Sequence, residues 1–158
     1  MPLTRIAIVA LITILIDQIT KFLVVEWLDL ANRLRITVWD PYFNLTMAWN
    51  EGINFGWFGS EHDAMRYVLI TIAVAMVAVL IWWARNKPSW LIPICVGLIT
   101  GGALGNVVDR IYYGAVADFI NVTCCNITNP FAFNVADIAI FIGAVWLILF
   151  ADRAANEG

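Results

Sequence analysis

Four long apolar stretches divide the chain and predict helices that cross a membrane. They cover residues of about 5–27, 64–84, 90–108 and 133–151. Crossing the hydrocarbon core takes about 20 mostly apolar residues in a helix. The second and third stretches are the most uniformly apolar, whereas the first and fourth carry ionisable side chains. Four crossings would place both termini on one side of the membrane.

The polar segments between these stretches fix the expected orientation. The short turn 85–89 contains Arg85 and Lys87, and short basic loops favour the cytoplasmic side. The termini would then be cytoplasmic, and the longer segments 28–63 and 109–132 would face outward.

The first outer segment has strand character. Between residues 43 and 50, apolar and smaller or polar side chains alternate with a period of two: Phe43, Leu45, Met47 and Trp49 against Asn44, Thr46, Ala48 and Asn50. This alternation is typical of a half-buried strand. We therefore expect an all-α membrane protein with four transmembrane helices and a small extracytoplasmic β platform at 28–63. Residues 109–132 are expected as an outer loop, and residues 1–158 as one integral-membrane domain.

Composition supports the membrane class and excludes several others. The chain is 62% hydrophobic and 13% charged, with a net charge of -3, and its mean hydropathy is +0.82. No basic stripe exists to neutralise phosphates, so nucleic acid is not an expected partner. The single His62 and the cysteines at 95, 124 and 125 form neither a metal-ligand spacing nor a disulfide framework. No metal and no cofactor are expected.

Polar side chains gather where the apolar stretches end. Asn106, Asp109 and Arg110 close the third stretch, while Asn134 and Asp137 open the fourth. Spacings of three and four residues place each group on one helix face. Asp17 and Lys21 are four residues apart in the outer half of the first stretch, so all these groups meet at the outer side. Charges at membrane depth are costly and usually face a cavity, a partner or a substrate path.

Two of the carboxylates have no cation beside them in sequence. Asp109 adjoins Arg110 and is interpreted as support, but Asp118 and Asp137 lack a dedicated counter-ion. Two carboxylates brought close together cannot both ionise and share a proton, as in aspartic proteases. Such a pair would activate water and protonate a leaving amine.

Simpler interpretations stand beside this one. Asp17 and Lys21 could only support helix packing, and Asp118 alone could be an exposed loop carboxylate. Gly101 and Gly105 form a G-x-x-x-G pattern, which favours close contact between helices. A proton or ion transporter would need acids near the midplane of several spans, and the sequence shows no such path. A structural membrane protein would lose stability, more than activity, on isosteric change at Asp118.

Five short blocks in order resemble a known family. They are Asp17-Gln-Ile-Thr-Lys21, Asn50-Glu-Gly52 with Phe55, Gly101-Gly-Ala-Leu-Gly-Asn106-Val-Val-Asp109-Arg110, Gly114-Ala-Val-Ala-Asp118-Phe119, and Phe133-Asn134-Val-Ala-Asp137. Together they resemble the motifs of bacterial lipoprotein signal peptidase (signal peptidase II), and they span nearly the whole chain. Asn54 departs from the pattern, which usually has a small residue there. The Cys124-Cys125 insert matches no motif.

The resemblance implies an activity and a set of roles. It implies an aspartyl endopeptidase of the bacterial inner membrane, with its active site facing the periplasm. The substrates would be diacylglyceryl-modified prolipoproteins in membrane lipid, cut before the lipid-bearing cysteine, and a monomer would suffice. The catalytic pair would be Asp118 and Asp137. Substrate binding or support of the pair would fall to Asn50, Gly52, Asn106, Asp109, Arg110, Asn134, Asp17 and Lys21.

Overall fold

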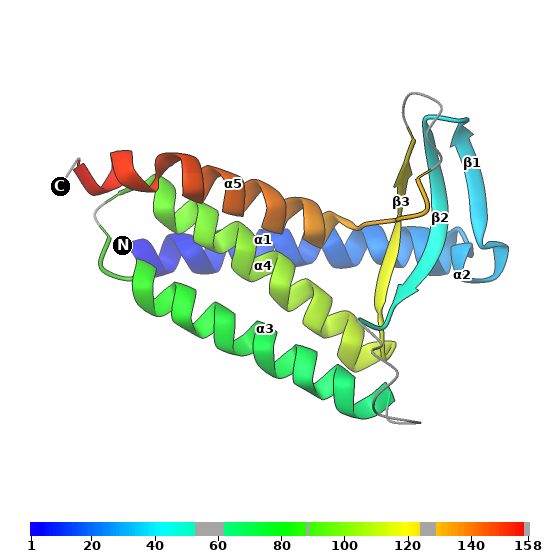
Figure 1. Ribbon diagram of the computed structural model, residues 1–158, viewed down its shortest axis with the longest axis horizontal. Helices are drawn as coiled ribbons and strands as arrows, with labels where there is room; N and C mark the ends of the chain where they lie inside the picture. The colour runs from blue at the N-terminus through cyan, green and yellow to red at the C-terminus, as the bar shows by residue number, and fades with distance from the viewer. Residues whose placement is uncertain (53–61, 88, 124–128, 157–158) are drawn as a thin grey trace.

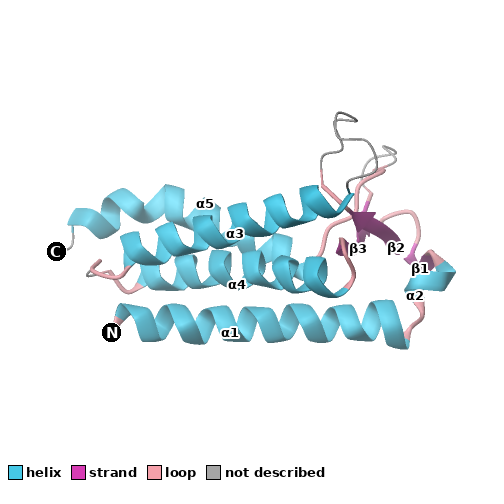
Figure 2. Cartoon of the chain, turned by 90° about the horizontal axis from the view of Figure 1, so that it is seen from below, coloured by secondary structure: helices cyan, strands magenta, loops and turns pink. Residues whose placement is uncertain are grey.

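The computed structural model describes residues 1–52, 62–87, 89–123 and 129–156. Within these residues, four long helices run side by side and a small sheet lies at one end of the bundle (Figures 1 and 2). The helices are α1 (Pro2–Lys21), α3 (His62–Ala84), α4 (Leu91–Tyr112) and α5 (Val135–Asn156). Both termini lie at the end away from the sheet (Figure 1). Asn54, Phe55 and the Cys124-Cys125 insert fall outside the described residues.

The helices agree with most of the predicted spans. In the described chain, three helices are long and apolar enough to cross a membrane: Pro2–Trp27, Ala64–Ala84 and Leu91–Tyr112. The first consists of α1 and a π-helical turn, η1 (Phe22–Trp27), that continues it. The third ends four residues beyond the predicted 108. The predicted fourth span, 133–151, corresponds to α5, whose apolar stretch Val135–Phe150 is shorter than the other three.

Helix α4 is central because its glycines let two other helices approach its backbone. A Cβ added to Gly101 would lie 2.7 Å from the carbonyl oxygen of Ala10, and one added to Gly105 would lie 2.7 Å from Oδ2 of Asp17, both on α1. Gly102 is similarly closed by the backbone of Ala136 on α5. The predicted close contact at the G-x-x-x-G pattern is confirmed.

The sheet draws strands from both outer segments. After the short helix α2 (Leu30–Arg33), strands β1 (Arg35–Trp39) and β2 (Phe43–Asn50) form the predicted platform. The segment 109–132, however, is not simply a loop: it begins inside α4 and contains β3 (Val116–Val122). The strand order is β1-β2-β3, and both pairs are antiparallel. The edge of β2 supplies hydrogen-bond partners that make β3 extended, and the local sequence gives no sign of this pairing.

The two faces of β3 have different surroundings. Ala117 and Phe119 are buried with Val25 of η1 and Leu30 of α2 in a small apolar core. Because successive side chains alternate between faces, Asp118 lies on the other face and is 4% exposed. It stands opposite Ala48 of β2 and hydrogen-bonds to the amide of Asn50. The apolar core beneath the sheet therefore holds Asp118 in a fixed position toward the helices.

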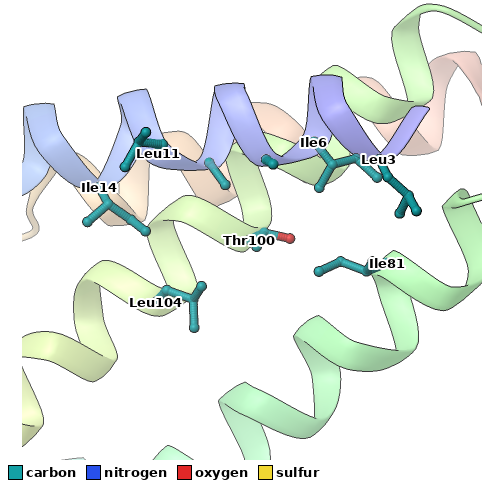
Figure 3. Close-up of a pocket in the computed structure, with 9 residues that line it drawn as sticks. Leu3, Ile6, Leu11, Ile14, Ile81, Thr100 and Leu104 are labelled. Carbon is teal, nitrogen blue, oxygen red and sulfur yellow. The ribbon is translucent and has the colours of Figure 1, made fainter. Parts of the chain in front are cut away.

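Helix α3 packs less closely and leaves an apolar cavity of about 410 Å³ between itself, α1 and α4. Leu3, Ile14, Ile81 and Leu104 are among its lining residues (Figure 3). Thr100 of α4 is buried there and its Oγ1 has no hydrogen-bond partner in the described structure. The cavity lies on the side of α4 that faces α3, so it is separate from the polar network described next.

Candidate active site

Two asparagines link the carboxylates of Asp118 and Asp137. The amide of Asn134 donates to Oδ1 of Asp118 at 2.6 Å and to Oδ1 of Asn106 at 3.2 Å. The amide of Asn106 in turn donates to Oδ1 of Asp137 at 2.9 Å. Asn50 completes the set by donating to Oδ2 of Asp118 at 3.1 Å. Residues far apart in the sequence, from β2, α4, β3 and the start of α5, thus form one network around two acids.

The start of α5 explains the orientation of Asp137. Asn134 is positioned as its N-cap: its Oδ1 accepts from the backbone N–H of Asp137 at 2.9 Å, and Oδ2 of Asp137 accepts from the N–H of Asn134 at 3.2 Å. This reciprocal pattern is a capping box. Asp137 therefore has one oxygen on the helix terminus and the other on Asn106, while the cap leaves the Asn134 amide free to reach Asp118.

A buried lysine organises the support beneath this network. Lys21 is 1% exposed. Its ammonium lies 2.8 Å from Oδ2 of Asp17 and 2.6 Å from Oδ2 of Asp109, and it donates to Oδ1 of Asn106 at 3.3 Å. Gln18 joins the two acids by donating to both. One ammonium between two buried carboxylates leaves a net negative charge, which is tolerable because N–H donors also reach both acids.

Each supporting acid holds one of the segments that carry the pair. Oδ1 of Asp17 accepts from the backbone N–H of Ala136 at 2.9 Å, next to Asp137 in sequence. Oδ2 of Asp109 accepts from the N–H of Ala117 at 3.1 Å, next to Asp118. The ion-paired cluster of Asp17, Lys21 and Asp109 therefore fixes the spacing between β3 and α5.

The environment changes the proton affinity of Asp118. Burial raises its pKa to about 6, and the nearby charge of Asp137 acts in the same direction. Hydrogen bonds from Asn50 and Asn134 oppose this rise but do not cancel it. The two carboxyl groups are thus coupled, and the carboxyl of Asp118 retains a proton more readily than an exposed aspartate does.

Arg110 forms no ion pair with Asp109, its neighbour in sequence. No carboxylate lies within 4.0 Å of it in the described residues, and Asp109 pairs with Lys21 instead. Its Nη1 donates weakly to the carbonyl oxygen of Asn106 at 3.4 Å, and its buried Nε has no partner there. The guanidinium still acts electrostatically on Asp118 and Asp137.

Gly52, two residues after Asn50, has a positive φ angle, a conformation that favours glycine. Its φ is 95° and its N–H donates to Oδ1 of Asn50 at 3.1 Å. An added Cβ would clash with Leu69 of α3. The turn therefore holds the Asn50 side chain, whose Nδ2 bonds Asp118. Among the described residues, no group of three or more His, Cys, Asp or Glu side chains is placed to hold a metal ion.

The chain is similar to known proteins over most of its length. The family model for signal peptidase II matches residues 9–152. The chain is 39% identical to the lipoprotein signal peptidase of Rhodopseudomonas palustris (strain ATCC BAA-98 / CGA009), over 87% of this chain and 85% of that protein. It is also 39% identical to that of Teredinibacter turnerae, over 95% and 90%. The chain belongs to the signal peptidase II family.

Solved structures show the same fold. A bacterial membrane enzyme determined by the in meso method at 1.9 Å resolution superposes with a TM-score of 0.75 at 24% identity, covering 91% of this chain and 90% of that one. A second, at 2.3 Å resolution, gives a TM-score of 0.71 at 22% identity, covering 97% and 91%. Family and fold together indicate an integral-membrane protease of the signal peptidase II type.

The structure brings together the residues that the sequence singled out for the candidate site, except Arg110, which makes only a weak contact. Sequence reasoning missed Gln18, which connects Asp17, Asp109 and the carbonyl oxygen of Gly105. The sequence does contain a sign of this role, because a polar amide such as that of Gln18 inside an apolar stretch is unusual and needs hydrogen-bond partners. The backbone N–H groups of Ala117 and Ala136, which donate to Asp109 and Asp17, could not be identified from the sequence.

Changing Gly105 to Ala should disturb this site through α1. The new Cβ would lie 2.7 Å from Oδ2 of Asp17, so the carboxylate must move from Lys21 or from the N–H of Ala136. We expect a clear fall in the melting temperature in detergent, measured by intrinsic fluorescence. The matched control is Val108→Ala on the same helix, whose side chain is 40% exposed; equal behaviour of the two variants would contradict the close packing.

Proposed function

We propose that this chain is an aspartyl endopeptidase that cleaves the signal peptide from diacylglyceryl-modified prolipoproteins, immediately before the lipid-bearing cysteine. Asp118 and Asp137 form its catalytic pair. The observation that carries the proposal is that both acids belong to one asparagine network, while neither has a cation within 4.0 Å in the described chain. Membership of the signal peptidase II family supplies the reaction class.

The geometry suggests a division of labour within the pair. Asp118, with its raised pKa, carries the shared proton, and Asp137 acts as the base. Asp137 takes a proton from water as the water oxygen attacks the scissile carbonyl carbon, and Asp118 donates its proton to the carbonyl oxygen. When the C–N bond breaks, Asp137 gives its proton to the leaving amine, and Asp118 takes a proton back from a hydroxyl of the tetrahedral intermediate as the carbonyl group re-forms. The enzyme thereby regains its starting state.

The supporting residues would hold this pair while the substrate enters. Asn50, Asn106 and Asn134 fix the carboxylate oxygens, and the Asp17–Lys21–Asp109 cluster fixes the backbone on either side. The N–H donors of Arg110 that have no partner among the described residues are available to a substrate carbonyl. We propose four membrane crossings with α5 as the fourth. The sheet end would then face the periplasm and the termini the cytoplasm of a monomer in the inner membrane.

Replacing Asn50 by Ala should change the pH dependence of cleavage. The Asn50 amide donates to Asp118 and lowers the pKa of that carboxyl, so its loss should raise that pKa further above 6. Asp118 would then keep its proton to higher pH, and the alkaline limb of kcat/KM should move upward. The pH profile of kcat/KM measured on a lipid-modified peptide tests this prediction. An unchanged alkaline limb would show that the hydrogen bond from Asn50 does not influence the pKa of Asp118.

A reconstitution experiment tests the proposed function as a whole. Purified protein in lipid is given a diacylglyceryl-modified prolipoprotein and, separately, the same precursor without lipid. We expect mass spectrometry to show a product that begins at the modified cysteine, only with the first substrate. Cleavage of both precursors at equal rates would contradict the lipid requirement, and absence of cleavage of the modified precursor would contradict the activity.

A further inference from the structure

A basic and aromatic pocket lies at the opposite end of the molecule from the proposed active site. It has a volume of about 270 Å³ and is lined by Trp82, Trp83, Arg85, Asn86 and Lys87, at the end of α3 and in the turn that follows. At the volume of liquid water this would hold about nine molecules. That space suits a small charged group such as a phosphodiester with its alcohol.

Both cations of this pocket are held by aromatic rings. The guanidinium carbon of Arg85 is 5.6 Å from the centroid of the Trp82 ring, and Nζ of Lys87 is 5.0 Å from that of Trp83. These distances lie within the range of cation–π attraction. The rings restrain two flexible side chains side by side, so less entropy remains to be lost when an anion binds.

Within the described residues, the donors of these two cations have no hydrogen-bond acceptor or ion-pair partner. In the part of the chain that the structure describes, no carboxylate lies within 4.0 Å of Arg85 or Lys87, and neither side chain donates a hydrogen bond. Basic residues often cap the carbonyl oxygens of a helix C-terminus. Arg85 and Lys87 instead contact the indole rings of Trp82 and Trp83, so capping of the helix does not account for their placement.

The position of the pocket indicates the source of the anion. It adjoins the end of a helix that is long and apolar enough to cross a membrane, and Trp82 is 63% exposed. Tryptophan at a helix end is typical of the headgroup level, and basic pockets at this level bind anionic lipid headgroups. We propose that residues 82–87 bind the phosphate headgroup of an anionic phospholipid, independently of the proteolytic site.

Lipid retention measured by native mass spectrometry tests this proposal. Full-length protein is purified in detergent with equal amounts of phosphatidylglycerol and phosphatidylcholine, and bound lipids are counted. Wild type should retain phosphatidylglycerol preferentially. Arg85→Gln with Lys87→Gln should reduce that preference roughly 25-fold, because each cation contributes about fivefold. Trp82→Leu with Trp83→Leu, which keeps the charge, should also weaken it.

Two controls distinguish a specific lipid site from nonspecific electrostatic attraction and from a site for free phosphate. Arg5→Gln with Arg33→Gln removes the same charge elsewhere and should reduce the preference less than the pocket variant does. Inorganic phosphate and glycerol phosphate should not displace the lipid at millimolar concentration. An equal loss in the control, full retention in the tryptophan variant, or displacement by inorganic phosphate would each overturn the proposal.

Discussion

Asp118→Asn should lower kcat for prolipoprotein cleavage at least about a thousandfold while leaving the fold at neutral pH at least as stable as before. The activity is lost because an amide cannot carry the shared proton, and general acid–base catalysis contributes factors of this size. Stability is retained because burial raises the pKa of Asp118 from 3.8 to about 6. At pH 7.5 the buried carboxylate is ionised and disfavours the folded state by about 3 kcal/mol, which Asn removes.

The raised pKa of Asp118 also determines how the stability of the folded protein changes with pH. The folded state binds the proton of Asp118 more tightly than the unfolded chain, so wild type should gain stability as the pH falls from about 6 to about 4. Asp118→Asn should lose this gain. The amides of Asn50 and Asn134 both donate to Asp118, but an Asn side chain offers only one acceptor oxygen. One of the two amides must therefore flip, which reduces the stability gained by removing the charge.

Asp29→Asn is the matched control for that substitution. Asp29 is exposed, and its φ of 57° is a conformation that Asn adopts readily. It should leave both cleavage and melting temperature unchanged. If Asp118→Asn instead destabilised the protein and left the activity of the folded fraction intact, the polar network would serve only helix packing, as in a structural membrane protein.

Lys21→Met should destabilise the protein by about 3–5 kcal/mol, because it leaves two buried carboxylates without their cation. Asp17 and Asp109 are both 0% exposed, and each accepts from a backbone N–H beside one of the proposed catalytic aspartates. We expect a large fall in melting temperature and loss of cleavage even in the fraction that remains folded. Thermal unfolding in detergent, with cleavage measured on the same preparation, provides both readouts.

A triple variant makes this second prediction specific. Lys21→Met combined with Asp17→Asn and Asp109→Asn removes all three charges and should recover part of the lost stability, since it leaves no charge unpaired. Arg5→Met on the same helix is the control for loss of one cation and should have little effect. Additive losses in the triple variant would contradict the electrostatic role of Lys21.

Local pattern was sufficient for the long apolar helices and for strand β2. Length and apolarity predicted α1, α3 and α4, and the alternation over 43–50 predicted β2. The spacing of Asn134 and Asp137 placed them on one face, and the capping box shows the reason for that spacing. These features depend on neighbours within one turn or on membrane thickness, so sequence alone contains them.

Features that depend on partners from distant segments were not predictable. Strand β3 was expected as loop, because its extended form depends on the edge of β2. Asp109 is followed in sequence by Arg110, but its cation comes from Lys21 on another helix, and the sequence does not show this pairing. The approach of Asp17 to the start of α5 likewise depends on how α1, α4 and α5 pack, where Gly105 leaves room for the carboxylate.

The most direct test of the account is the pH profile of kcat/KM for a lipid-modified substrate, from about pH 4 to about pH 9, which spans the ordinary range of a perturbed aspartate. Two coupled carboxyl groups that share one proton should give a bell-shaped curve whose apparent constants belong to the pair. We expect the alkaline limb near pH 6, where Asp118 loses its proton. A profile that stays flat across this whole range would contradict a proton-sharing pair of Asp118 and Asp137.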